Sequence, residues 1–324
     1  MPWCLRSVDP ATAQGAPDMH AFCARSAKLT TFVFLIGNGR SGSSLVHELL
    51  ARHPDVGFVS NVEDRIPLLP PGASRYNNQI YRMVPQALTR KGRVRYAPSE
   101  GYRVLARQVS PMVADSMRDL VASDAMPWVS ELYRSFFLAR ARAQGKRVFL
   151  HKLTGWPRTG FIQAVFPDAR FIHILRDGRA VVASALKVPF WYGWRGPEHL
   201  HAGPLTPEYA REWEASGRSF PLLAGLAWKT MMDAYARAKD LIPPEQWLDI
   251  RFEDLVADPV SQCDRMVDFM GLEPNERFEA ALSKMTFVKA RRNAYHKDLD
   301  ARCIGLLDSS LKEHLLHWGY SDVT

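Results

Sequence analysis

Five apolar runs, rich in β-branched and aromatic residues, predict the strands of a β-sheet. They cover residues 29–36, 56–60, 146–152, 169–176 and 246–252. The first run, LTTFVFLI, is apolar almost without interruption, which is typical of a parallel strand buried on both faces. The run at 56–60 carries the weakest strand pattern of the five.

Helical spacing of apolar residues follows these strands. In the segment 44–53, Leu45, Val46, Leu49 and Leu50 fall on one face of a helix. Further helices are predicted over residues 159–166, 178–187, 222–241 and 259–272. Strands that alternate with helices predict an α/β fold, in which a parallel sheet is flanked by helices on both faces. Ligands of such sheets bind beyond the carboxyl ends of the strands, so candidate chemistry is expected there.

The remaining segments interrupt this alternation. Residues 1–28 are predicted to be an N-terminal tail, and residues 29–324 a single α/β domain. Within the domain, residues 66–146 are mixed and mostly helical in pattern, which predicts an insertion. The stretch 188–209 has no period but contains Pro, Gly and five aromatic residues. It is predicted to be a long loop or lid that extends to about residue 220.

The composition is that of a folded, basic protein. Apolar residues make up 47% of the 324 residues and charged residues 23%, which excludes global disorder. The net charge of +8 favours an anionic ligand, nucleic acid or a membrane face, although solubility alone explains it equally well.

Cysteine usage and hydropathy indicate a cytoplasmic protein. The four cysteines form no CxxC pair and no metal-binding spacing, so reduced thiols are expected. The N-terminus has no apolar core of a signal peptide, and no apolar run approaches the roughly 18 residues needed to span a bilayer. The cysteines are Cys4, Cys23, Cys263 and Cys303.

The segment after the first strand, FLIGNGRSGSS at 34–44, has the layout of a phosphate-binding loop. Gly37, Gly42 and the following serines have the spacing of a Walker A motif, but Ser43 stands where that motif carries lysine. Backbone N–H groups and the helix N-terminus would still hold an anion. Arg40 adds a fork of donors suited to a tetrahedral oxyanion. The alternative is an ordinary glycine-rich turn between a strand and a helix.

A second strand leads into RDGRAVVAS, which repeats this arrangement. Arg176 would project from the carboxyl end of the strand, and Ser184 lies about two turns into the next helix. An arginine and a hydroxyl suit a second, separate phosphate. Asp177 is either the cap of that helix or a magnesium ligand. The neighbouring Arg176 favours the cap, and with no other cluster at metal-ligand spacing we expect no metal site.

The chain resembles a known family at these two loops. GNGRSGSS and RDGRAVVAS are similar to the two cofactor motifs of sulfotransferases that use 3′-phosphoadenosine 5′-phosphosulfate (PAPS). The segments HKLTGW, FPDARFIHILRDGR, DIRFEDLVADP and HWGY extend the resemblance over about residues 30–320. The arginine in the first loop is typical of bacterial members, including mycobacterial and actinobacterial ones. The resemblance implies a P-loop-type parallel sheet and a PAPS-dependent transferase.

The resemblance also implies roles for individual residues. The loop around the 5′-phosphosulfate would comprise Gly39, Arg40, Ser41, Gly42, Ser43 and Ser44. Arg176 and Ser184 would hold the 3′-phosphate, and Phe252 would lie beside adenine. Lys152, at a strand end, would act with Arg40 near the transferred group.

Two later arginines, Arg291 and Arg292, lie roughly where a basic segment closes on the 3′-phosphate in the family. The alternative for this pair is a solvated basic patch.

The general base is not fixed by the resemblance, because Thr154 stands where the cytosolic animal enzymes carry a catalytic histidine. Glu63 follows the second strand, where several bacterial and carbohydrate-acting members place a catalytic glutamate. His151 is the second candidate, although it alternates with Lys152 along a strand and would point to the opposite face. Glu63 is therefore the preferred prediction. The alternatives are a capping carboxylate for Glu63 and a buried histidine for His151.

The function implied is in-line transfer of the sulfuryl group from PAPS to an acceptor hydroxyl, without a metal. A small molecule, a carbohydrate or a glycolipid would serve as acceptor, and a homo-oligomer is compatible with the sequence. One alternative is a P-loop kinase, against which the missing loop lysine argues. Another is a nucleic-acid module, supported by the charge and by FWYGWRG, but no recognised nucleic-acid motif accompanies them.

Overall fold

The computed structural model describes residues 30–83, 96–283 and 295–320. The predicted N-terminal tail, Arg291 and Arg292 lie outside these residues.

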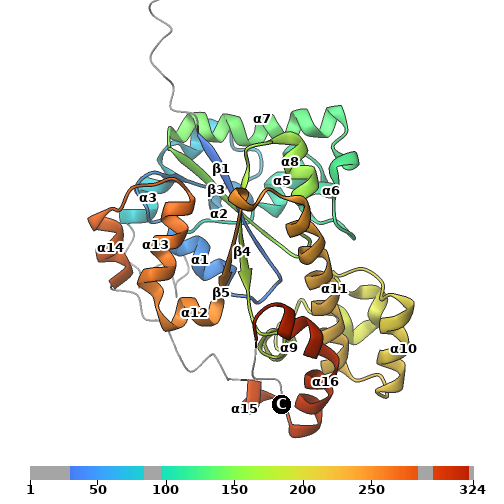
Figure 1. Cartoon of the computed structure of the whole chain (residues 1–324). Helices are drawn as coiled ribbons and strands as arrows, with labels where there is room; N and C mark the ends of the chain where they lie inside the picture. The colour runs from blue at the N-terminus through green and yellow to red at the C-terminus, as the bar shows by residue number, and fades with distance from the viewer. Residues whose placement is uncertain (1–29, 84–95, 284–294, 321–324) are drawn as a thin grey trace, which may run out of the picture.

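A five-stranded parallel sheet forms the centre of the molecule (Figure 1). The strand order is β2-β3-β1-β4-β5, and every neighbouring pair is parallel. The strands are β1 (Thr31–Gly37), β2 (Val56–Gly57), β3 (Val148–Thr154), β4 (Arg170–Leu175) and β5 (Trp247–Arg251). The five predicted strands and the α/β fold are therefore confirmed.

Strand β2 is shorter than its apolar run predicts, and the cause is a side chain. The side-chain amide of Gln144 accepts a hydrogen bond from Phe58 N at 3.1 Å and donates one to Phe58 O at 2.9 Å. These bonds take the place of strand pairing directly after Gly57. The chain then turns at Ser60 into the helix α2 (Asn61–Arg65).

Alternate residues of the central strand enter two separate cores. Phe34 and Ile36 belong to the larger core, whereas Val33 and Leu35 belong to the smaller one. The larger core is covered by α7 (Pro127–Gln144), α8 (Thr159–Val165), α11 (Phe220–Leu241) and α16 (Ala301–His317). The smaller core is covered by α1 (Ser43–Leu50), α12 (Phe252–Ala257), α13 (Pro259–Phe269) and α14 (Glu276–Ser283). Helices thus flank both faces, as predicted.

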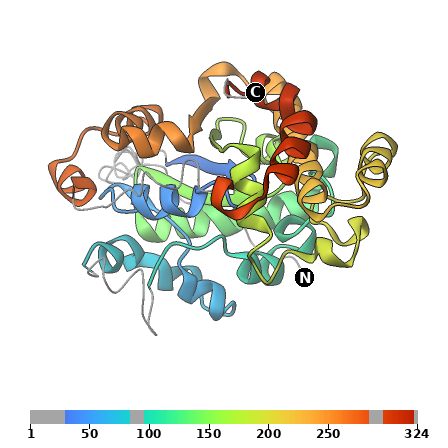
Figure 2. The ribbon, with the colours of Figure 1, turned by 90° about the horizontal axis from the view of Figure 1, so that it is seen from below.

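Helix α16 lies along α11, as Figures 1 and 2 both show, and the pair supports α9 (Gly178–Ala185). Gly178 opens α9 against Trp228 and Leu311, and a Cβ at this position would come within 2.9 Å of both side chains. Only glycine allows this approach, so the segment that leads into α9 is held against two long helices.

The chain between β2 and β3 is mostly helical where it is described. Its elements besides α2 and α7 are η1 (Pro71–Tyr76), α3 (Asn77–Met83), α5 (Tyr102–Gln108), α6 (Pro111–Ala114) and η2 (Ala122–Asp124). The remaining short elements are η3 (Tyr192–Arg195), η4 (Pro197–His199), α10 (Pro207–Ala215), η5 (Pro244–Gln246) and α15 (Tyr295–Asp298).

The aperiodic stretch 188–209 contains η3 and η4 and reaches the first turn of α10. Leu200 and Ala202 are buried, whereas Phe190 and Trp194 are more than half exposed. Its movement as a lid stays a prediction.

No helix in the described part of the chain is long and apolar enough to cross a membrane.

Candidate functional site

The first loop connects β1 to α1 in a conformation that glycine makes possible. Arg40 and Gly42 have positive φ values of 70° and 96°. A Cβ on Gly42 would lie 2.4 Å from the ring of Phe252, so glycine is required here and the loop rests on that ring. Ser41 Oγ donates to Asn38 O at 2.7 Å, which closes the turn. A loop of this kind at a helix N-terminus favours an anion.

The second loop, between β4 and α9, contacts the first at Arg40. Arg40 Nε donates to Ser184 Oγ at 3.0 Å, and a guanidinium nitrogen of Arg176 donates to Arg40 O at 2.8 Å. The Arg176 guanidinium also lies 4.7 Å from the centroid of the Phe252 ring, within cation–π range. Four residues that the sequence places on three separate segments are thus brought together.

Asp177 caps α9, as the residues around it predicted. Its carboxylate accepts from Arg179 N at 2.9 Å and from the Arg179 guanidinium at 2.7 Å. Arg179 in turn pairs with Asp308 of α16 at 2.8 Å. The carboxylate of Asp177 is therefore engaged in fixing the second loop to the C-terminal helix.

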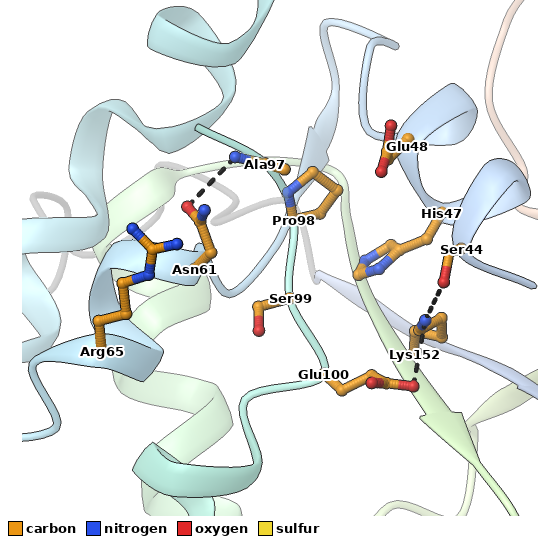
Figure 3. Close-up of a pocket in the computed structure, with 10 residues that line it drawn as sticks. All are labelled: Ser44, His47, Glu48, Asn61, Arg65, Ala97, Pro98, Ser99, Glu100 and Lys152. Carbon is orange, nitrogen blue, oxygen red and sulfur yellow. Dashed lines mark hydrogen bonds and ion pairs between the residues drawn. The ribbon is translucent and has the colours of Figure 1, made fainter. Parts of the chain in front are cut away.

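Lys152 lies at the carboxyl end of β3, beside the first loop. Its ammonium group is 2.7 Å from Ser44 Oγ and 3.1 Å from a carboxylate oxygen of Glu100 (Figure 3). Strand alternation produces this position, since Lys152 pairs in register with Leu35, whose side chain enters the core beneath α1. A cation is thereby held next to the predicted phosphosulfate loop.

A polar cavity of about 310 Å³ opens beside Lys152. Figure 3 shows the side chains around it, which come from α1, α2, β3 and the segment before α5. They are Ser44, His47, Glu48, Asn61, Arg65, Ala97, Pro98, Ser99, Glu100 and Lys152.

Glu63, the preferred base in the sequence analysis, does not line this cavity. It is only 2% exposed, and its carboxylate accepts hydrogen bonds from Ser60 at 2.9 Å, Asn77 at 2.6 Å and Arg140 at 2.9 Å. Ser60 and Glu63 form a capping box at the start of α2. Because both oxygens are committed to buried partners, Glu63 is a poor candidate for the base.

His151 does not line the cavity either. It is fully buried in the larger-core face of β3, with its ring edge-on to Phe34 and Phe137. Burial, together with the charges of Arg140, Arg158 and Lys152, lowers the pKa of His151 from 6.5 to about 3. Among the described residues neither ring nitrogen has a hydrogen-bond partner. A histidine in this environment binds a proton too weakly to serve as a base near neutral pH.

Two cavity residues, Glu100 and His47, were missed by sequence reasoning. Glu100 lies in the insertion, where no motif marks it, and its contact with Lys152 joins residues 52 positions apart. His47 lies one turn into α1 and is 1% exposed. The only sequence signal for His47 was its position three residues after Ser44, the last serine of the first loop.

Comparison with known proteins identifies the family. The model of the sulfotransferase family matches residues 33–276, three quarters of the chain. The chain belongs to the sulfotransferase family. The resemblance found in the two loops is thereby confirmed.

Two similar relatives are the omega-hydroxy-beta-dihydromenaquinone-9 sulfotransferases Stf3 of Mycobacterium bovis and Mycobacterium tuberculosis. Each is 28% identical over 183 residues, which is 54% of this chain and 42% of the relative. The matched segment is thus less than half the length of these relatives. Sulfotransferase STF9 from Mycobacterium avium has a similar fold, with a TM-score of 0.55 and 16% identity over 93% of this chain and 81% of that one.

The Glu63–Arg140 pair gives a stability prediction. Glu63→Gln leaves the fully buried Arg140 guanidinium without its counter-charge, which should cost about 3–5 kcal/mol of unfolding free energy. Urea unfolding measures this loss. As a control, Glu214→Gln in the exposed Arg218–Glu214 pair should leave the unfolding midpoint essentially unchanged. A Glu63→Gln protein of normal stability but much lower turnover would restore Glu63 as the base.

The buried His151 gives a pH prediction. Between pH 6.5 and about 3 the unfolded chain binds a proton at this histidine and the native chain does not. Stability is therefore lost as the pH falls through this window, by up to about 2.7 kcal/mol at pH 4.5. His151→Phe should remove this part of the pH dependence, whatever its effect on stability at pH 7. If the unfolding free energy of the wild type and of His151→Phe fell equally from pH 7 to 4.5, the proposed effect of burying His151 would be contradicted.

Proposed function

We propose that this chain transfers the sulfuryl group of PAPS to the hydroxyl of an acceptor. The observation that carries the proposal is the meeting of the two anion-binding loops at Arg40, beside the ammonium group of Lys152. The family to which the chain belongs supports the same reaction.

The donors of the two loops suit the two anionic ends of PAPS. The 5′-phosphosulfate would lie in the loop Gly39–Ser44, with Arg40 and Lys152 next to the transferred group. The 3′-phosphate would be bound by Arg176 and Ser184. In the structure Arg40 donates to Ser184 Oγ across the gap between the loops, so ligand binding would exchange this bond for bonds to phosphate oxygens. The exchange is inexpensive because Arg40 is exposed.

Phe252 supports both loops from below, against Gly42 and under the Arg176 guanidinium. We propose that adenine lies beside this aromatic ring.

The acceptor would enter the polar cavity next to Lys152. Its wall presents hydroxyl, amide and charged groups, including Asn61, Arg65 and Ser99, which suit a hydroxylated head group such as a sugar. Val62 on α2 and Ile66, the residue directly after that helix, are 37% and 51% exposed and add an apolar surface next to Asn61 and Arg65. A carbohydrate-bearing or otherwise amphipathic acceptor fits this combination.

A P-loop kinase is less well supported. Ser43 replaces the loop lysine, and the carboxylate that would hold magnesium, Asp177, is engaged with the guanidinium of Arg179.

Replacing Arg176 tests the nucleotide assignment. Arg176→Ala should weaken binding of adenosine 3′,5′-bisphosphate by about 10- to 150-fold, the worth of a charge-assisted contact of roughly 1.5–3 kcal/mol. Binding of adenosine 5′-phosphosulfate, which lacks the 3′-phosphate, should change much less. Isothermal titration measures both, and an unchanged melting temperature without ligand excludes a folding defect. Equal losses for the two nucleotides would mean that Arg176 acts only through Arg40 and Phe252.

Metal removal separates the sulfotransferase from the kinase. Chelator-treated enzyme should keep full PAPS turnover, because side-chain cations replace the metal in this proposal. Saturation with adenosine 3′,5′-bisphosphate at about 100 times its Kd should add roughly 2.7 kcal/mol of stability, measured by thermal unfolding. Loss of turnover on chelation with rescue by Mg²⁺, or stabilisation by ATP–Mg²⁺ alone, would favour the kinase.

A further inference from the structure

Glu100 is held at the wall of the cavity by the backbone of the residues next to it. The preceding segment bridges to Ser60 through Pro98, and Ser99 N donates to Val59 O at 2.8 Å. Gly101, with φ of +68°, then starts α5. The Glu100 side chain is 23% exposed, so it is open to a ligand in the cavity, unlike that of Glu63.

A chain of hydroxyl groups orients the Glu100 carboxylate. One carboxylate oxygen accepts a short hydrogen bond from Thr154 Oγ1, and Tyr102 OH lies 2.8 Å from the same Thr154 oxygen. Since threonine has a single hydroxyl proton, which goes to Glu100, the phenol of Tyr102 is the donor to Thr154. Burial, with the charge of Glu100, raises the pKa of Tyr102 and keeps this phenol protonated.

The same carboxylate oxygen lies 3.1 Å from Lys152 Nζ, which in turn lies 2.7 Å from Ser44 Oγ. Carboxylate, ammonium and loop hydroxyl therefore form a continuous line from the cavity to the anion-binding loop, as the dashed lines in Figure 3 mark. A group that removes a proton from an acceptor hydroxyl must lie on this cavity side of the loop.

His47 is the other candidate on the cavity wall. Its Nε2 has no hydrogen-bond partner among the described residues, but the atom is buried and the residue is only 1% exposed, so an acceptor in the cavity has little access to it. Burial, and next the charge of Lys152, lowers the pKa of His47 well below 6.5. The imidazole is thus a poor proton acceptor beside the Lys152 ammonium. Glu100 is the more accessible of the two, because its side chain is 23% exposed whereas His47 is 1% exposed.

We propose that Glu100 is the general base of the sulfuryl transfer, an inference that rests on the function proposed above. The acceptor O–H proton passes to the Glu100 carboxylate while the acceptor oxygen forms the new O–S bond. The S–O bond to the 5′-phosphate breaks, and its electron pair leaves on the phosphate oxygen of adenosine 3′,5′-bisphosphate. The sulfate ester is the other product, and Glu100 returns its proton to water.

The ion pair between Glu100 and Lys152 couples proton removal to stabilisation of the leaving group. Before transfer, the negative charge of Glu100 offsets the Lys152 ammonium. Once Glu100 takes up the proton, the lysine charge is no longer offset, and it acts on the negative charge that grows on the departing phosphate beside Ser44. Proton removal and leaving-group stabilisation are therefore coupled through one side chain.

Glu100→Gln tests the proposal with radiolabelled PAPS and a series of substituted phenols of graded acidity as acceptors. Turnover should fall by about 10²–10⁴-fold for weakly acidic phenols, and the loss should shrink for acidic phenols that ionise without help. Affinity for adenosine 3′,5′-bisphosphate should change by less than about threefold. Glu313→Gln, an exposed carboxylate on α16, is the matched control and should behave as the wild type.

Thr154 provides a second variant that leaves the carboxylate in place. Thr154→Val removes the hydroxyl that orients Glu100 and should lower turnover by about tenfold, the worth of one hydrogen bond. Thr154→Ser should restore it. The double variant with Glu100→Gln should be no slower than Glu100→Gln alone.

Three outcomes would overturn the assignment: full activity of Glu100→Gln, an equal loss for every phenol, or additive losses in the double variant. If the wild type accepts no phenol, hydrolysis of PAPS by water is measured instead, and an unchanged rate in Glu100→Gln overturns the assignment. A wild type that neither binds adenosine 3′,5′-bisphosphate nor turns over PAPS refutes the proposed function, and the base assignment with it.

Discussion

The contact between the two loops at Arg40 is the interaction on which the site depends. One residue supplies both halves of it, because its side chain donates to Ser184 and its carbonyl accepts from Arg176. The left-handed conformation of Arg40, at φ 70°, turns its carbonyl and side chain toward the second loop. The Phe252 ring under Gly42 and Arg176 keeps the loops from separating. The proposed anion donors in the loops after β1 and β4 thereby lie in one site.

The alternation of side chains along β3 determines which of its polar residues reach the site. Its odd and even residues enter different cores, so neighbouring side chains have unlike environments although they are adjacent in the chain. Lys152 reaches the loop serine and an acidic partner, whereas His151 is buried among aromatic rings. Thr154, two residues after Lys152, reaches Glu100. Thr154 stands where related enzymes carry a catalytic histidine, and in this structure it contacts Glu100, which lines the cavity.

The sequence was sufficient for the parts of the molecule that are local. Strands, helices, both loops and the cap at Asp177 follow from residues within one or two turns of each other. Glu63 shows that a local pattern can support two interpretations, because Ser60-x-x-Glu63 is also a capping-box pattern visible without a structure. Glu100 could not be found, since only the packing of the insertion against β3 brings it to Lys152. The early end of β2 depends likewise on Gln144, 86 positions from Phe58.

The way the insertion is fastened to the sheet bears on how such an enzyme could diversify. Two of its attachments are buried: the amide of Gln144 on Phe58 and the Arg140 guanidinium on Glu63, both out of reach of any ligand. The cavity wall itself, with Asn61, Arg65 and Ser99, is made by side chains outside these attachments. The two buried attachments and the cavity wall thus use different side chains. If acceptors bind at this wall as proposed, drift or directed evolution can change acceptor preference through its side chains while the buried attachments stay unchanged.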